Sequence, residues 1–225
     1  MAFNLQWADN KPTPWNLGKI VCIGRNYAEH AKELNNPIPA KPLLFIKPAT
    51  AAVDITKPLQ LPAGQGECHH EAEIALLVGD TISKVSPDQA MTNIVGVGLA
   101  LDLTLRDLQS QLKEKGHPWE VSKAFDGSAP LSGFIPCEPV CDEHLEISMS
   151  VNGQLRQQGS CDQMITPVAE LVSYISQIFT LEAGDVILTG TPAGVAALNA
   201  GDRFEMSLRN EHQEVHLQVA GTVAS

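Results

Sequence analysis

The chain has 225 residues, 44% of them hydrophobic and 18% charged, and its formal net charge at pH 7 is −11. This acidic balance argues against a nucleic-acid-binding or anionic-membrane-binding protein, because both surfaces need basic patches. No apolar run reaches the roughly 18 residues of a membrane span, and no secretory signal is visible. The five scattered cysteines fit a reducing compartment. We therefore expect a cytoplasmic protein.

The first half of the chain alternates apolar runs with polar segments. Residues 1–18 are predicted to form an N-terminal arm, and residues 19–225 a single domain. Buried strands are predicted over residues 19–24, 43–48, 69–80 and 94–102.

Two helices are predicted in this half. The first covers residues 25–35, with Asn26 as its candidate N-cap. The second covers residues 104–116 and ends at Gly116. Its apolar side is formed at helical spacing by Leu101, Leu105, Leu108 and Leu112.

The second half is richer in strands. Residues 122–133 are predicted to be a loop, and residues 146–159 a hairpin around Asn152-Gly153, a strong two-residue turn pattern. Thr166-Pro167 opens a further helix. Strands are expected over residues 186–190, 203–208 and 215–221. The sequence therefore predicts a strand-rich α+β fold with few helices.

Two glutamates mark one end of the strand over residues 69–80. Glu71 and Glu73 are two apart and project to the same side, where two carboxylates repel unless a cation lies between them. Asp102, at the end of the next strand, is a third candidate ligand, and three carboxylates favour Mg²⁺ or Mn²⁺. A solvated strand end is the alternative. His69 shares their face, which leaves a mixed zinc-like site open, and His70 points away as a hydrogen-bonded or packing residue.

Polar residues at helical spacing extend this candidate site. Asp102, Arg106 and Gln109 fall at i, i+4 and i+7, an arrangement that grips an anionic, oxygen-rich small molecule. His30 and Glu33 are three apart, so the carboxylate orients the ring for activating water or moving protons. Both patterns also occur on ordinary solvated helix faces.

Two further motifs are weaker. The TGTPAGV stretch, residues 189–195, offers loop amides and the Thr191 hydroxyl to a carboxylate, with a plain turn as the alternative. Cys137 and Cys141, followed by His144, suggest zinc, but no fourth ligand is near.

Seven pieces of the sequence, in order, resemble the fumarylacetoacetate hydrolase family in its short single-domain form. They run from about residue 20 to 203 and are IGRNYAEHAKEL, LFIKP, HHEAEIALLVG, LALDLTLRDLQ, SKAFDGSAPLSGF, VNGQLRQ, and VILTGTPAGV followed by NAGD. The resemblance implies a mixed β-sandwich roll with a few peripheral helices, usually as a homodimer. The extra N-terminal domain and the additional aspartate ligand of the long family members have no match here.

The resemblance also implies roles for particular residues. The Mg²⁺ or Mn²⁺ ligands would be Glu71, Glu73 and Asp102. The catalytic residues would be His30, Glu33 and Lys123. The substrate contacts would be Arg25, Arg106, Gln109 and Thr191.

The implied substrate is a small 2-oxo acid, whose carboxylate and keto oxygen chelate one metal ion. We expect hydrolysis of small acylpyruvates, in which His30 deprotonates a water that attacks the far carbonyl and pyruvate enolate is expelled. The alternatives on the same scaffold are oxaloacetate decarboxylation or tautomerisation, and a hydratase or isomerase of aromatic-degradation 2-oxo acids. A metal-dependent 2-oxo-acid-binding protein without turnover is the non-enzymatic rival.

Overall fold

The computed structural model describes residues 3–34, 36–138 and 144–225. Within these ranges the strands form three sheets. The largest, in the order β2-β1-β12-β5-β6-β8-β3 with β9 paired to β6, consists of β1 (Ile20–Gly24), β2 (Leu43–Lys47), β3 (Ala52–Asp54), β5 (Ala72–Val78), β6 (Ile94–Leu101), β8 (Ala129–Leu131), β9 (Ile135–Pro136) and β12 (Val186–Leu188). The second, in the order β11-β10-β14-β15, consists of β10 (Glu146–Val151), β11 (Gln154–Ser160), β14 (Arg203–Arg209) and β15 (Val215–Thr222). The third, in the order β13-β4-β7, consists of β4 (Cys68–His70), β7 (Thr104–Leu105) and β13 (Ala196–Ala197).

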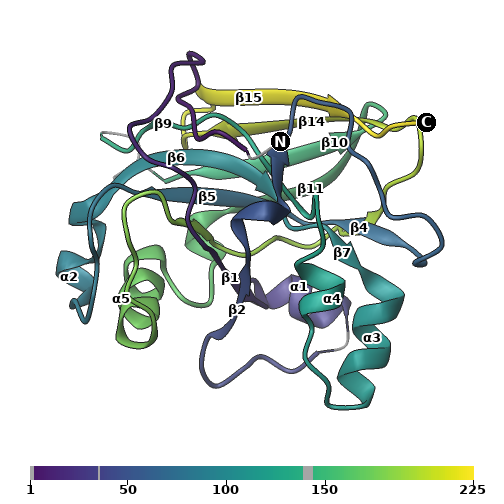
Figure 1. Cartoon of the computed structure of the whole chain (residues 1–225), viewed down its shortest axis with the longest axis horizontal. Coiled ribbons are helices and arrows are strands. Elements are labelled where there is room, and N and C mark those ends of the chain that lie inside the picture. The colour runs from purple at the N-terminus through teal and green to yellow at the C-terminus, as the bar shows by residue number, and fades with distance from the viewer. Residues whose placement is uncertain (1–2, 35, 139–143) are drawn as a thin grey trace.

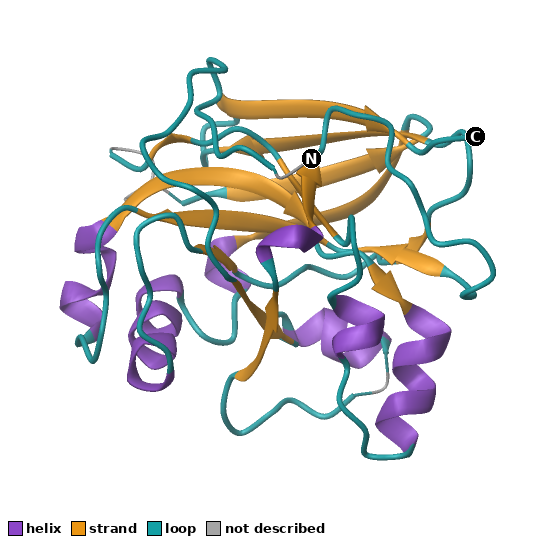
Figure 2. Cartoon of the chain, in the orientation of Figure 1, coloured by secondary structure: helices purple, strands orange, loops and turns teal. Residues whose placement is uncertain are grey.

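The helices lie at the periphery of these sheets. They are α1 (Ala28–Glu33), α2 (Pro87–Ala90), α3 (Arg106–Glu114), α4 (Glu120–Lys123) and α5 (Val168–Ile178). Figures 1 and 2 show the four-stranded sheet above β5 and β6, with α2 and α5 near one end of the molecule and α1, α3 and α4 near the other. This is the strand-rich α+β roll that the sequence predicts.

The core lies between the two larger sheets. Every residue of β5 is buried, as expected for a strand covered on both faces. Its side chains Ile74, Leu76 and Val78 belong to the same apolar cluster as Leu99 of β6 and Phe204 of β14. The carboxylates of the candidate site therefore lie at one end of a buried strand pair, β5 and β6.

Several predicted elements are confirmed. Strands cover most of each predicted strand range, and Gly116, with a φ of 65°, follows the end of α3. Asn152 and Gly153 have φ values of 52° and 76°, which are the two positive values that a type I′ hairpin turn requires.

The second predicted helix begins later than its leucine spacing indicates. Thr104 and Leu105 pair as β7 with His69 and Cys68 of β4, so the helix starts only at Arg106. Leu101 is likewise a strand residue, in β6. The prediction that Asp102 shares a helix face with Arg106 was therefore wrong, because cross-strand pairing outweighs helical periodicity here.

Two local predictions also fail. The N-cap of α1 is Tyr27, whereas the Asn26 amide accepts from Thr166 N at 2.8 Å and donates to the carbonyls of Thr166 and Thr189. The predicted loop over residues 122–133 contains the end of α4 and all of β8.

The residues before β1 pack on the large sheet. Leu5 is buried, and main-chain bonds join Ala8 N to the Phe134 carbonyl (2.7 Å) and Phe134 N to the Gln6 carbonyl (3.0 Å). The boundary of the arm at residue 18 stays a prediction. None of the helices in the described ranges is both long and apolar enough to span a membrane.

Candidate active site

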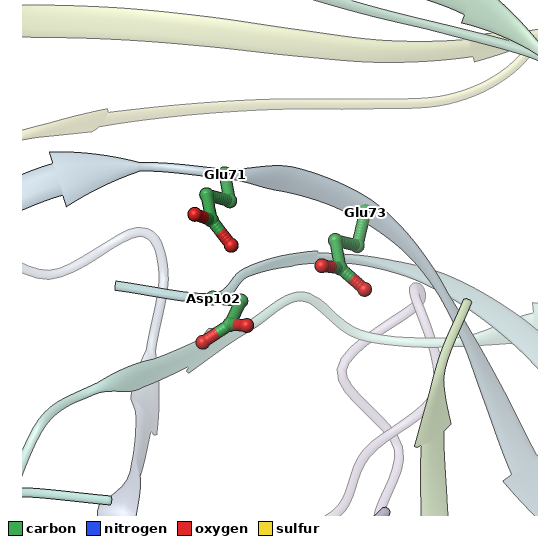
Figure 3. A group of neighbouring side chains, drawn as sticks. All are labelled: Glu71, Glu73 and Asp102. Atoms are coloured by element: carbon green, nitrogen blue, oxygen red, sulfur yellow. The ribbon is translucent and has the colours of Figure 1, made fainter. Parts of the chain in front are cut away.

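Three carboxylates converge where β5 and β6 meet the small sheet. Glu71 lies in the one-residue break between β4 and β5, Glu73 on β5, and Asp102 directly after β6. The strands are in register through Ala72 and Leu101, and Asp102 N donates to the Glu71 carbonyl at 2.8 Å. Figure 3 shows the three carboxylate groups lying close together. One oxygen from each lies within 4.8 Å of the others, and all three side chains are buried.

Three cations surround this cluster. Lys123 Nζ, on α4, lies 2.8 Å from Glu71 Oε2 and 2.6 Å from Asp102 Oδ2. The Arg106 guanidinium, at the start of α3, pairs with Glu71 Oε1. Glu73 differs from the other two acids, because its Oε2 accepts from Gly190 N at 2.6 Å and the described residues offer it no ion-pair partner within 4 Å.

The third cation is Lys47, at the end of β2, to which the sequence analysis assigned no role. Its side chain is fully buried, and Nζ lies 2.8 Å from Asp102 Oδ1. Nζ also donates to the carbonyls of Ser128 (2.9 Å), Leu103 (3.4 Å) and Lys123. Lys47 therefore joins the backbone that follows Asp102 to the backbone at Lys123 and Ser128. The sequence pattern that could have revealed Lys47 is a lysine at the end of an apolar strand.

Burial and neighbouring charges shift the pKa values of the groups in this cluster in different directions. Burial raises the pKa of Glu71, but Lys123 and Arg106 outweigh it and hold that pKa well below its usual range. Burial, with the negative charges of Asp102 and Glu71, raises the pKa of Glu73 well above its usual range. Burial lowers the pKa of Lys123, yet Asp102 and Glu71 raise it overall, so this amine stays protonated.

A hard divalent cation fits these residues. The donor set is entirely carboxylate oxygen, which suits Mg²⁺ or Mn²⁺. Asp102 Oδ1 is buried and accepts no hydrogen bond, although Lys47 is at ion-pair distance, so this oxygen keeps a lone pair for a ligand. Burial and the charges of Asp102 and Glu71 raise the pKa of Glu73, and a cation bound beside it would favour its ionised form.

The zinc-like alternatives find less support. His69 Nε2 lies 2.9 Å from Glu67 Oε2, and its Nδ1 accepts from Arg106 Nε. Among the described residues, the acidic trio is the group of potential ligands that converges, and it includes no histidine. Of the second candidate zinc set, Cys137 is disulfide-bonded, His144 pairs with Asp162, and Cys141 lies outside the described residues.

The predicted histidine–glutamate pair is present on α1. His30 Nδ1 lies 3.2 Å from Glu33 Oε2, and the His30 side chain is 6% exposed. Glu33 Oε1 in turn accepts from Gly194 N at 3.0 Å, which ties α1 to the TGTPAGV loop. With Nδ1 facing a carboxylate, Nε2 is the ring nitrogen left for a substrate, and His30 lines the same cavity as Glu71 and Glu73.

A buried glutamine, Gln157 of β11, holds the other side of this loop. Its Nε2 donates to Thr191 Oγ1 and to the Pro192 carbonyl, each at 2.8 Å. Its Oε1 accepts from Ala72 N at 3.0 Å and lies 2.8 Å from His70 Nδ1. Burial lowers the pKa of His70, so a neutral ring donates this bond, which agrees with the predicted packing role. Thr191 lines the cavity, but its hydroxyl already donates to the Ala72 carbonyl at 2.8 Å.

The cavity in front of the carboxylates is small and rich in cations. Its volume is about 40 Å³. The four residues predicted to contact substrate all line it, and Arg106 Nη1 donates to Gln109 Oε1 at 2.9 Å. Basic side chains in its wall are Arg25, Arg106, Lys113 and Lys123. In a chain of net charge −11, this concentration of positive charge indicates an anionic ligand. Lys113 was missed, although it follows Arg106 by two helical turns.

The sequence and the fold are similar to those of known proteins. Residues 19–222 match the family model described as Fumarylacetoacetate (FAA) hydrolase C-terminal. "Oxaloacetate tautomerase YcgM" of Escherichia coli (strain K12) is 48% identical over 193 residues, covering 85% of this chain and 88% of the relative. "Oxaloacetate decarboxylase, mitochondrial" of Dictyostelium discoideum is 46% identical over 190 residues, covering 83% and 87%. The crystal structure of a fumarylpyruvate hydrolase from Pseudomonas aeruginosa, in complex with Mn²⁺ and pyruvate, has a TM-score of 0.90 and 35% identity, covering 99% of this chain and 96% of that chain.

Proposed function

This chain belongs to the fumarylacetoacetate hydrolase family, and we propose that it catalyses the keto–enol tautomerisation of oxaloacetate, with decarboxylation to pyruvate as a second outcome of the same site. The observation that carries this proposal is the position of His30, paired with Glu33, in the wall of the cavity that Glu71 and Glu73 also line. The relatives named for activity on oxaloacetate favour it over acylpyruvate hydrolysis, the main expectation from the sequence.

Binding depends on the cations of the cavity wall. Glu71, Glu73 and Asp102 would hold the divalent ion, which when bound supplies Lewis-acid stabilisation of negative charge on the 2-oxo oxygen. The Arg106–Gln109 pair presents guanidinium and amide donors to the substrate carboxylate. Lys123 stays protonated and adds positive charge where the enolate develops.

Proton transfer falls to His30. Glu33 accepts a hydrogen bond from Nδ1–H of His30, so Nε2 carries the lone pair that removes a proton from C3 of the keto form. The electron pair of that C–H bond becomes the C2–C3 double bond, and the 2-oxo oxygen takes up a proton to give the enol. In decarboxylation the C3–C4 bond breaks instead, its electron pair becomes the C2–C3 double bond of the enolate, and CO₂ leaves. A solvent proton relayed through His30 then adds to C3 to give pyruvate.

The test follows the keto–enol conversion of oxaloacetate by stopped-flow absorbance, with Mg²⁺ and with a chelator. We expect the protein to accelerate the conversion severalfold or more over Mg²⁺ alone, and to lose the acceleration in chelator. Pyruvate release from oxaloacetate measures the decarboxylase outcome in the same samples. No acceleration with Mg²⁺ or Mn²⁺ would refute the tautomerase proposal.

Acylpyruvate hydrolysis is the second candidate. A histidine oriented by a carboxylate also suits activation of water, and a structural neighbour is named a fumarylpyruvate hydrolase. Metal-dependent release of pyruvate from acetylpyruvate, without tautomerisation of oxaloacetate, would favour this candidate. Oxalate binding without any turnover would favour the non-enzymatic rival.

Other expectations stay proposals. These are the homodimer, the cytoplasmic location, and Mg²⁺ rather than Mn²⁺ as the working metal. The hydratase or isomerase alternative on the same scaffold differs in needing a longer substrate.

A further inference from the structure

The outer part of the cavity wall contains two cations without acidic partners. Lys113 Nζ, on α3, donates to the neutral Asn36 Oδ1 at 2.9 Å, and Arg25 Nη1 donates to the Pro37 carbonyl at 3.3 Å. Neither forms an ion pair with any carboxylate of the described residues. The inner cations differ, because Lys123 and Arg106 both pair with Glu71.

Lys113 is held where its charge is costly. Its side chain is partly buried, and burial together with the charges of Arg25 and Arg106 lowers its pKa. Lys115, two residues later at the C-terminal end of α3, is exposed instead. A solvated surface lysine would turn away from two neighbouring guanidinium groups, whereas Lys113 lines the same cavity wall as both, an arrangement that suits an anionic ligand.

The backbone at Arg25 supports the same conclusion. Arg25 has a φ of 61°, the left-handed region that non-glycine residues adopt at a cost of about 1–3 kcal/mol. This conformation directly follows β1, and the Arg25 side chain lines the cavity with Lys113. Strain of this kind persists where the surrounding structure imposes it, often at ligand-binding sites.

The inner cations, Lys123 and Arg106, and the outer cations, Lys113 and Arg25, define two places where a negative group of a ligand can bind. The carboxylate and keto oxygen of a 2-oxo acid occupy the inner place, beside Glu71, Glu73 and Asp102. Both pairs of cations line the same cavity, so one ligand can contact both. An acylpyruvate with an uncharged end would leave Lys113 and Arg25 uncompensated.

We propose that Lys113, with Arg25, binds the distal carboxylate of a short dicarboxylic 2-oxo acid and makes the site selective for dicarboxylates. This rests on the proposed function for the inner place, and it assigns to Lys113 a role in specificity rather than in chemistry. Among the 2-oxo acids considered above, four-carbon oxaloacetate matches it and acetylpyruvate does not.

The test compares two probes that differ only in the distal carboxylate. Malate and lactate share a carboxylate and a 2-hydroxyl group, and malate alone has the second carboxylate. Their Kd values are measured by calorimetry on the Mg²⁺-loaded protein, in wild type, Lys113→Met, Lys113→Arg and the matched control Lys115→Met. Thermal melts verify that each variant is folded.

We expect wild type to bind malate more tightly than lactate, and Lys113→Met to reduce that preference about tenfold by weakening malate alone. Lys113→Arg and Lys115→Met should keep the preference. An unchanged preference in folded Lys113→Met, or equal weakening of both probes, would overturn the inference. The comparison of malate with lactate measures binding alone, so it does not depend on whether the wild-type protein turns over oxaloacetate. A malate preference that needs Lys113, without oxaloacetate turnover, would refute the proposed function and leave the subsite standing.

Discussion

Replacing Lys47 by methionine tests whether the buried charges at the site depend on one another. The ammonium group is fully buried, lies 2.8 Å from Asp102 Oδ1, and donates to the carbonyls of Ser128, Leu103 and Lys123. Methionine keeps the length of the side chain but leaves the carbonyls without this donor and Asp102 with only Lys123 as a cation. Breaking a buried ion pair from one side typically costs about 3–5 kcal/mol.

We therefore expect Lys47→Met to lower the free energy of unfolding by about 3–5 kcal/mol, a large share of the roughly 5–15 kcal/mol of a typical domain. For a chain of this size, this corresponds to a fall in Tm of about 6–20 °C. Urea unfolding followed by circular dichroism measures the change. The control is Lys32→Met, because Lys32 is 79% exposed and 3.8 Å from Glu29, so its loss should change stability by less than about 0.5 kcal/mol. A Lys47→Met protein as stable as the control would refute the reasoning.

Three further changes test the metal, the base and the loop. Glu73→Gln should weaken Mn²⁺ binding at least about tenfold in calorimetry, because two carboxylates remain, and unchanged affinity would exclude Glu73 as a ligand. His30→Gln should slow tautomerisation by about 10²–10⁴-fold while oxalate still binds; a rate close to wild type would assign the proton transfer to another group. Gly194→Ala should move the loop that holds Glu33, because Gly194 has a φ of 101° and an added Cβ would lie 1.8 Å from the Arg156 carbonyl oxygen. A Tm loss of several degrees and reduced turnover are expected, and a variant equal to wild type in both would contradict the loop's role.

The features that local patterns encode were predictable. The Asn152-Gly153 turn follows from two residues that tolerate positive φ. The same-side projection of Glu71 and Glu73 follows from strand geometry, and the pairing of His30 with Glu33 from helix geometry. Assigning them to one site relied on the ordered family motifs, because each pattern alone is common.

The predictions that were wrong, and the role of Lys47 that was missed, depend on contacts between distant parts of the chain. Asn26 was predicted as a helix cap, but its amide bonds to Thr166, 140 residues away. Lys47 acquires its role from carbonyls 56–81 residues further along. The helix after Asp102 starts late because Leu105 pairs with another strand. No window of sequence contains these partners, so no periodicity reveals them.

The central claim is that Glu71, Glu73 and Asp102 together hold a divalent cation. Crystals grown with Mn²⁺ and oxalate, with data collected for anomalous scattering from Mn²⁺, test it most directly. The account predicts one peak about 2.0–2.2 Å from an oxygen of each carboxylate, with oxalate completing the coordination and facing Arg106 and Gln109. Carboxylates still bridged by Lys123, with no Mn²⁺ among them at saturating concentration, would contradict it.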